Sequence, residues 1–133
     1  MLITREMDYA LRTLRALHQN GQLSAAAIAR KECMPKAMTL KILKRLHAAG
    51  LVASRRGPSG GYLLQRPCDE LYMADLLLAL EEPVFVNRCQ QPGYHCENQA
   101  ENGCGLCREL FRIQHILDEE LRKTPLSETF RDS

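Results

Sequence analysis

The stretch from residue 25 to residue 66 limits what this chain can fold into more than any other part of the sequence. It begins with a short helical pattern over 25–31, a turn and a longer helical pattern over 35–49. Short helix, turn and longer helix is the layout of a helix-turn-helix. Two strand-like runs then follow around the glycine-rich segment 57–61, and such a pair predicts a β-hairpin. A β-hairpin directly after a helix-turn-helix is a wing, so the sequence predicts a winged helix.

Local signals predict where these helices begin and end. Apolar residues at three- and four-residue steps favour an amphipathic first helix over 4–19. The pair Asn20-Gly21 ends that helix. Ser24 is the expected N-cap of the second helix, and Pro35 fits the first turn of the third.

The third helix is expected to have an apolar side and a cationic side. At 100° per residue, Ile42 and Leu46 lie on an arc that would pack inward. The basic residues occupy a separate arc and the N-terminal end: Lys36, Lys41, Lys44 and Arg45. Such an arc suits entry into a DNA major groove, because phosphates line both of its walls. A lysine stripe that only keeps the surface soluble is the other interpretation.

The wing is predicted from strands over 51–56 and 62–66. Glycines at its tip would let the backbone approach a groove closely, and an arginine beside a narrow tip can enter the minor groove. The candidate DNA contacts here are Arg55, Arg56, Ser59 and Gly60. An ordinary glycine-rich hairpin is the alternative.

Charge is distributed unevenly along the chain. Residues 1–66 carry 12 Lys and Arg against 3 Asp and Glu, a net charge of +9. Residues 67–133 carry 6 against 13, a net charge of −7, so the overall +2 hides a strong polarity. The asymmetry favours a polyanion facing the first half. A solvated basic surface would give the same counts.

Several protein classes are not expected. Residues 1–20 hold charges and no signal-peptide apolar core, and no run approaches the roughly 20 apolar residues that cross a bilayer. We therefore expect a cytoplasmic protein without a membrane partner, in which thiols stay reduced. The sequence has no nucleophile–base constellation and no phosphate-binding glycine loop, so an enzyme is not expected.

Four of the six cysteines, Cys89, Cys96, Cys104 and Cys107, lie close together in a segment rich in Gly, Pro, Asn and Gln. That composition predicts a loop, whose thiolates could be held by a metal, by disulfides or by nothing. Only the last two cysteines have the two-residue spacing of a zinc knuckle, so a zinc ribbon fits poorly. Iron–sulfur clusters tolerate wider spacing. His95 is a further candidate ligand, although a solvated loop histidine is the simpler interpretation.

Three segments of the sequence form recognisable motifs. They are Asp8-Tyr9-Ala10-Leu11-Arg12, Leu43-Lys44-Arg45-Leu46 before Gly50-Leu51, and Arg56-Gly57-Pro58-Ser59-Gly60-Gly61-Tyr62. In these segments the chain resembles the IscR/NsrR-type (Rrf family) winged-helix regulators, and the resemblance covers nearly the whole chain. It implies a homodimeric transcriptional regulator that binds a palindromic operator in double-stranded DNA. It also implies an iron–sulfur cluster, 2Fe–2S or 4Fe–4S, in the cysteine loop.

The resemblance places Cys89, Cys96 and Cys104 on three ligand positions, although the gaps between them are one or two residues longer than usual. IscR-like members use a histidine three residues after the third cysteine, where this chain has Cys107. NsrR-like members use an acidic residue near the N-terminus of the partner subunit, where this chain has Asp8. We favour Cys107. Without a cofactor, its thiol would lie in the first turn of a helix, whose dipole would lower its pKa.

The remaining two cysteines, Cys33 and Cys68, are expected to be ordinary buried or half-buried thiols. Some relatives place a histidine ligand near Cys33, which gives it a smaller claim on the cofactor. Without a cluster, the chain would be a winged-helix regulator of the same family. Its cysteines would then act as a thiol switch, or a partner protein would regulate it.

A terminal helix is expected from Leu106 until Thr124-Pro125. Its near-heptad stripe comprises Leu110, Ile113, Leu117 and Leu121, widened by Phe111 and Ile116. The stripe could pack on the first and fourth helices of its own chain, whereas the resemblance implies that it pairs with its mate in a dimer.

The expected domain order has four parts. A winged helix-turn-helix over 1–66 is followed by a connecting segment over 67–88, which contains a fourth amphipathic helix. The cluster-binding loop covers 89–107, and the dimerisation helix and tail cover 108–133. The expected fold class is therefore mainly α with a small β-hairpin wing.

Overall fold

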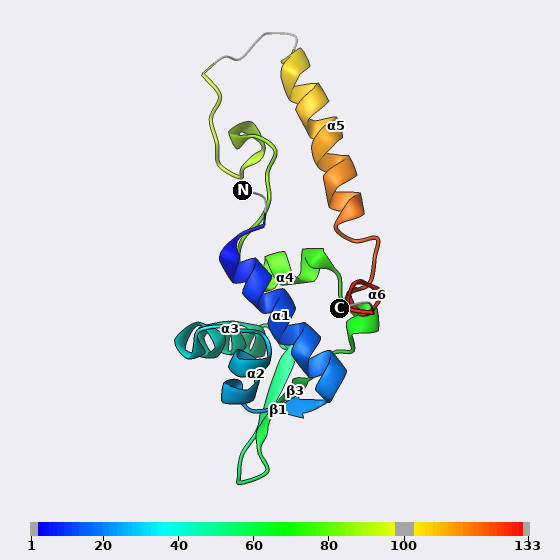
Figure 1. Cartoon of the computed structure of the whole chain (residues 1–133). Helices are drawn as coiled ribbons and strands as arrows, with labels where there is room; N and C mark the ends of the chain where they lie inside the picture. The colour runs from blue at the N-terminus through cyan, green and yellow to red at the C-terminus, as the bar shows by residue number, and fades with distance from the viewer. Residues whose placement is uncertain (1–2, 98–102, 132–133) are drawn as a thin grey trace.

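The computed structural model describes residues 3–97 and 103–131. Residues 98–102 of the predicted cysteine loop and the last two residues of the predicted tail lie outside the described residues. The elements, labelled in Figure 1, are α1 Arg5–Asn20, β1 Gln22–Leu23, α2 Ala25–Lys31, α3 Lys36–Ala48, β2 Val52–Arg55, β3 Gly61–Leu64, the 3-10 helix η1 Cys68–Glu70, α4 Met73–Ala79, the 3-10 helix η2 Arg88–Gln90, α5 Gly105–Glu120 and α6 Leu126–Thr129.

Helices α1, α2 and α3 pack around one apolar core. The predicted periodicity is confirmed, since the fully buried side chains of these helices include Met7, Ala10, Leu14, Ile28, Ile42, Leu43 and Leu46. Each buried Leu or Ile contributes about 1.5–3 kcal/mol relative to an exposed one. The N-caps are Thr4 for α1 and Ser24 for α2; each side-chain oxygen accepts a backbone N–H at 3.1 Å. An N-cap of this kind stabilises a helix by about 1 kcal/mol.

The wing forms as predicted and gains a third strand. Strand β2 pairs antiparallel with β3, with Val52 opposite Leu64 and Arg55 opposite Gly61. The two-residue strand β1 pairs with the other edge of β3, so the sheet order is β1-β3-β2. A β-carbon added at Gly60 would lie 2.3 Å from the carbonyl oxygen of Arg55. The tip can therefore close only around a residue without a side chain.

The C-terminal half closes the core and then extends away from it. The backbone N–H of Leu126 donates to the carbonyl of Leu71 at 2.8 Å, and that of Ala74 donates to the carbonyl of Leu121 at 3.1 Å. These bonds fix α6 beside η1 and the end of α5 beside α4. The rest of α5 stands away from the winged helix, alongside the segment that carries the cysteines (Figure 1).

The fold class is mainly α with a small antiparallel sheet, as the sequence predicts. Some boundaries differ: Pro35 is the N-cap of α3 rather than its first residue, and the terminal helix ends at Glu120. The short helix α6 and strand β1 have no counterpart in the prediction. In the part of the chain that the structure describes, no helix is long and apolar enough to span a membrane.

Candidate nucleic-acid interface and cysteine loop

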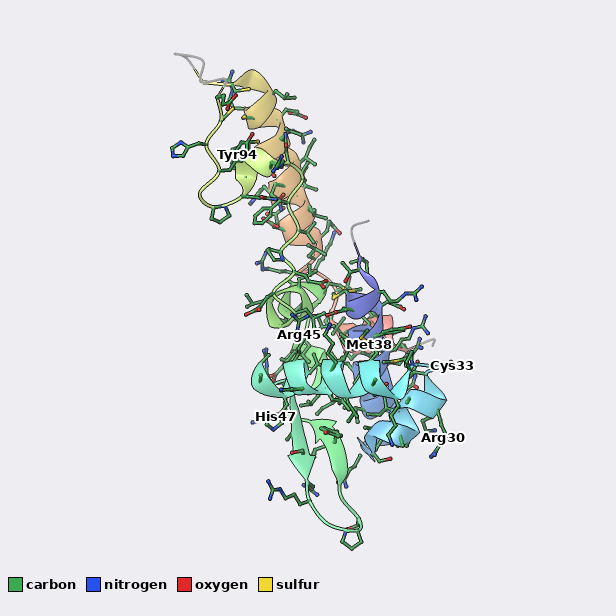
Figure 2. The ribbon with its side chains drawn as sticks, turned by 90° about the vertical axis from the view of Figure 1, so that its left-hand side faces the viewer. Arg30, Cys33, Met38, Arg45, His47 and Tyr94 are labelled. Carbon is green, nitrogen blue, oxygen red and sulfur yellow. The ribbon has the colours of Figure 1, made fainter. Side chains whose placement is uncertain are left out.

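The outer face of α3 is exposed across its length. Lys36, Lys41 and Lys44 are exposed on it, whereas Arg45 is half-buried. Figure 2 looks onto this face: the β-hairpin projects from one side of α3, with His47 on the edge toward the hairpin and Arg45 on the opposite edge. The helix thus brings its predicted lysines to one accessible surface and places Arg45 at the margin of that surface.

Two of the four predicted cations on α3 already have a partner. The Arg45 Nη1 donates to Glu6 Oε2 of α1 at 2.6 Å, and the Lys41 Nζ forms an ion pair with Glu6 Oε1. The hydrogen bond from Lys41, together with both positive charges, lowers the pKa of the Glu6 carboxyl below its ordinary value. No ion pair is recorded for Lys36 or Lys44 among the described side chains.

The wing tip presents the other predicted contacts. Arg55, Arg56 and Ser59 are exposed and Gly60 is half-buried. The side-chain amide of Gln22 in β1 donates to the carbonyl of Ser59 at 2.6 Å. This bond fixes the tip relative to the sheet, so the arginines are presented from an ordered turn.

Three further exposed residues adjoin this surface, and the sequence reasoning missed them. His47 and Leu40 lie on the outer side of α3, with Leu40 45% exposed although it is apolar. Arg30 is exposed near the end of α2 (Figure 2). The signal that could have found Leu40 and His47 is helical spacing, because they lie four residues before and three after Lys44.

Cysteines from η2 and α5 come together. The Sγ atoms of Cys89 and Cys107 are 3.8 Å apart, and Cys104 is the N-cap of α5. The nearby backbone N–H and thiol of Cys107 lower the pKa of the Cys104 thiol. The neighbouring thiols of Cys104 and Cys89 raise the pKa of Cys107 to about 12. The expectation of a lowered pKa at Cys107 is therefore wrong, because the effect of the helix N-terminus falls on Cys104 instead.

The thiols fit a metal or cluster in part. Two sulfurs bound to one tetrahedral ion at about 2.3 Å would lie about 3.8 Å apart, which is the spacing of Cys89 and Cys107. Soft thiolates are the donors that iron–sulfur clusters use. Within residues 3–97 and 103–131, however, no three side chains of His, Cys, Asp or Glu are grouped to hold a metal ion. Cys96 is half-buried, and no contact between it and the other thiols is recorded in the described segments.

The alternative ligands Asp8 and His95 make no contact with the Cys89–Cys107 pair among the described residues. Asp8 of α1 forms an ion pair with Arg12 at 3.0 Å, and His95 is exposed.

Cys68 is buried in η1, as expected, and burial raises the pKa of its thiol to about 11. Cys33 was expected to be buried or half-buried and is exposed instead. Its backbone is left-handed, with φ 52°, in the turn before α3. The residues on either side of it, Glu32 and Met34, are buried instead.

Helix α5 leaves most of its apolar side chains exposed. Its one buried residue is the polar Gln114. The exposed apolar residues of α5 are Leu106, Phe111, Ile113 and Ile116. Beside it, a hollow of about 800 Å³ lies between α4 and α5 and includes Leu78, which is 80% exposed. An apolar surface of this kind on a folded domain marks an interaction site.

These features define the class of the protein. A helix-turn-helix made by α2 and α3, packed on α1 and followed by the β2–β3 hairpin, is a winged helix. A family model for Rrf2, described as an iron-dependent transcriptional regulator, matches residues 3–132. The chain belongs to this family, whose members are transcriptional regulators and not enzymes.

Individual relatives carry two different names. The regulators named IscR from Photorhabdus laumondii and Serratia proteamaculans are each 36% identical to this chain over 93 residues. The match covers 68% of this chain and 57% of each relative, so the chain spans little more than half of their length. The structure of CymR, the global cysteine regulator of B. subtilis, has a TM-score of 0.79 and 26% identity, covering 100% of this chain and 98% of that one. The fold is also similar to that of T. potens IscR, with a TM-score of 0.74 and 19% identity, over 99% and 88% of the two chains.

Proposed function

We propose that this protein is a homodimeric, sequence-specific DNA-binding transcriptional regulator whose affinity for a palindromic operator depends on an iron–sulfur cluster. The observation that carries the proposal is the Cys89–Cys107 sulfur pair, spaced for a shared metal, in a chain whose other end is a winged helix with exposed cations. We keep the division into a winged helix over 1–66, a connecting segment over 67–88, a cluster loop over 89–107 and a dimerisation segment over 108–133.

Helix α3 and the wing would make the DNA contacts. The exposed Lys36 and Lys44 would reach phosphates and major-groove edges, with Lys41 and Arg45 beside them. Arg55 and Arg56 would lie at the minor groove, near the close backbone approach of Ser59 and Gly60.

The wing assignment is tested by Arg56→Ala, with Lys123→Ala as the matched control. Lys123 is exposed and pairs with Glu120 at the end of α5, away from the wing. Losing a base-edge or groove contact costs about 1–3 kcal/mol, so Arg56→Ala should bind the operator roughly 5- to 150-fold more weakly at physiological salt. Equal operator affinities for the two variants would count against the wing assignment.

The cofactor would be held by Cys89, Cys96 and Cys104, with Cys107 as the fourth ligand or Asp8 of the partner subunit in its place. Support for Cys107 comes from its sulfur, which lies 3.8 Å from that of Cys89 in the same chain. When bound, a cluster supplies an iron centre that oxidants and nitric oxide can alter. Thiolate ligands of this kind suit both 2Fe–2S and 4Fe–4S clusters.

The cluster assignment is tested by anaerobic reconstitution with iron and sulfide, quantified per chain. The wild-type protein should hold both and show visible absorbance that oxidant bleaches, and its operator affinity should differ between holo and apo forms. Cys89→Ser should lose the iron, whereas Cys33→Ser, which removes an exposed thiol in the turn before α3, should keep it. Full iron and sulfide content in Cys89→Ser would overturn the assignment.

A second candidate is a cluster-free regulator of the same family that uses its thiols as a switch or answers to a partner protein. It is favoured by the thiol contact between Cys89 and Cys107 and by the whole-chain similarity to CymR. Hydrogen peroxide could take two electrons and two protons from these thiols, forming one disulfide and two molecules of water. This candidate would be supported if the anaerobically purified protein is colourless and if hydrogen peroxide then forms a disulfide between Cys89 and Cys107.

A further inference from the structure

The ion pairs between α1 and α3 connect residues far apart in the sequence. Glu6 lies in the first turn of α1, and Lys41 and Arg45 are one helical turn apart on α3. Each cation takes a different oxygen of the one carboxylate: Lys41 uses Oε1, and Arg45 uses Oε2 at 2.6 Å. The carboxylate therefore holds both cations at the same time and leaves neither oxygen unused.

These two cations belong to the surface that would face DNA. The Lys41 side chain is 53% exposed and that of Arg45 is 34% exposed, whereas Glu6 is 24% exposed. DNA phosphates could thus reach the cations from the solvent side while the carboxylate contacts them from the protein side. Because the two cations share one negative charge, the group of three carries a net charge of +1 instead of +2.

The ion pairs are not what joins the two helices. Helices α1 and α3 pack through apolar side chains that are fully buried, among them Met7, Leu43 and Leu46. Such burial contributes about 1.5–3 kcal/mol per residue, whereas a partly exposed ion pair contributes about 0–1 kcal/mol. A carboxylate that is hardly needed for packing, yet pairs with two cations at once, acts mainly on their electrostatics.

We propose that Glu6 is an acidic competitor for DNA within the protein, which restrains Lys41 and Arg45 and so limits the affinity for DNA phosphates. This inference rests on the proposed DNA-binding function. In it, the carboxylate keeps one or both cations paired when the protein binds, so that they make fewer contacts with DNA phosphates than they could. Lys44, for which no ion pair is recorded among the described residues, binds phosphate without this competition.

The first test compares Glu6→Gln with the wild-type protein, using as a control Glu128→Gln, which removes one exposed carboxylate in α6. Equilibrium affinity is measured for operator and for unrelated DNA at about 50 and about 200 mM salt. Each added phosphate contact steepens the loss of affinity over this range by about 3.5-fold. Glu6→Gln should bind both DNAs about 3- to 10-fold more tightly at the lower concentration and lose about 3- to 12-fold more affinity on going to the higher one.

The second test uses Lys41→Gln and Lys44→Gln, which remove similar exposed lysines from the same helix. In the wild-type background, Lys41→Gln should weaken DNA binding less than Lys44→Gln, because Lys41 is partly neutralised. In the Glu6→Gln background the two losses should become equal, which a double-mutant comparison measures directly.

The outcomes distinguish a failure of the Glu6 proposal from a failure of the proposed DNA-binding function. If wild-type protein binds DNA but Glu6→Gln binds no more tightly, or more weakly, Glu6 only positions the cations and the inference is overturned alone. An equal loss for the two lysine variants in the wild-type background would overturn it as well. If wild-type protein binds neither operator nor unrelated DNA at any salt concentration, the proposed function fails, and this inference fails with it.

Discussion

Burial decides the chemistry of the two isolated thiols. Cys68 is 1% exposed, and its burial raises its pKa to about 11, so the reactive thiolate is scarce at neutral pH. Cys33 is exposed in the turn before α3. We expect an alkylating reagent at about pH 8 to modify Cys33 in the native protein and Cys68 only after unfolding. Mass spectrometry of the labelled peptides measures both rates, and equal native rates would contradict the burial of Cys68.

Glu6 should also make stability depend on pH. Its pKa is lowered in the folded protein, first by the hydrogen bond from Lys41. A lowered pKa means that the stabilisation is complete above the unfolded pKa, about 4.3, and is lost as the pH falls through the folded value. Between about pH 7 and about pH 3, Glu6→Gln should therefore lose less stability than the wild-type protein. Urea unfolding at the two pH values measures this, and Glu128→Gln should behave like the wild type.

At the residue scale, the sequence predicted which cations lie on α3 but not which of them are paired. Helical spacing is local, so Lys36, Lys41 and Lys44 could be assigned to one side of the helix from their positions in the sequence. The Glu6 pairs join residues 35 and 39 positions apart. They depend on how α1 crosses α3, which no local pattern encodes.

Among the elements, α5 is positioned by a polar side chain. Gln114 accepts the backbone N–H of Val86 at 2.8 Å and donates to the carbonyl of Val84 at 2.9 Å. Its amide thus satisfies two backbone groups of the segment that precedes η2. This contact aligns α5 with the chain that leads to Cys89.

Replacing Gln114 with Leu should loosen that alignment. The substitution leaves a partly buried N–H and a carbonyl without their partner, at about 1–3 kcal/mol for each group that water cannot reach. We expect faster hydrogen exchange at the Val86 amide and a lower melting temperature. His115→Gln, at the exposed neighbouring position, should change neither. Unchanged exchange at Val86 in Gln114→Leu would show that other contacts position the helix.

Long, strongly periodic elements were predicted well and short ones were missed. Helix α1 differs from its predicted range by one residue at each end, because its apolar spacing and its cap agree. Strand β1 has two residues, and its identity depends on pairing with β3. Helix α6 has four residues and is held by contacts with η1. Elements of this length are specified by tertiary contacts and not by their own sequence.

For the whole molecule, the exposed apolar side of α5 predicts a second copy of the chain. Phe111 is 54% exposed and adjoins the hollow between α4 and α5. We expect Phe111→Glu to give a folded monomer, because a charge at a dimer interface must be desolvated without a partner. Sedimentation of the two proteins measures this, with Phe111→Leu as the apolar control. A wild-type protein that sediments as a monomer would contradict the dimer.

The cysteine loop was predicted in composition but not in arrangement. Glycine, proline and asparagine indicate a loop, and four thiols within it indicate a metal site or disulfides. Which sulfurs meet depends on how η2 lies against the start of α5, which is a tertiary relation. The structure brings Cys89 and Cys107 together, and the positions of Cys96 and the partner subunit's Asp8 relative to that pair remain predictions.

The uneven charge of the chain has a consequence for how the molecule meets a polyanion. The basic winged helix lies at one end of the fold, and α5 with the cysteine segment extends from the other (Figure 1). A net charge of only +2 therefore coexists with a large electric dipole. In the field of a nucleic acid, such a dipole experiences a torque that turns the winged end forward before any contact forms. That alignment acts over about a Debye length, roughly 10 Å at 0.1 M salt, so added salt would make the first collisions less well oriented.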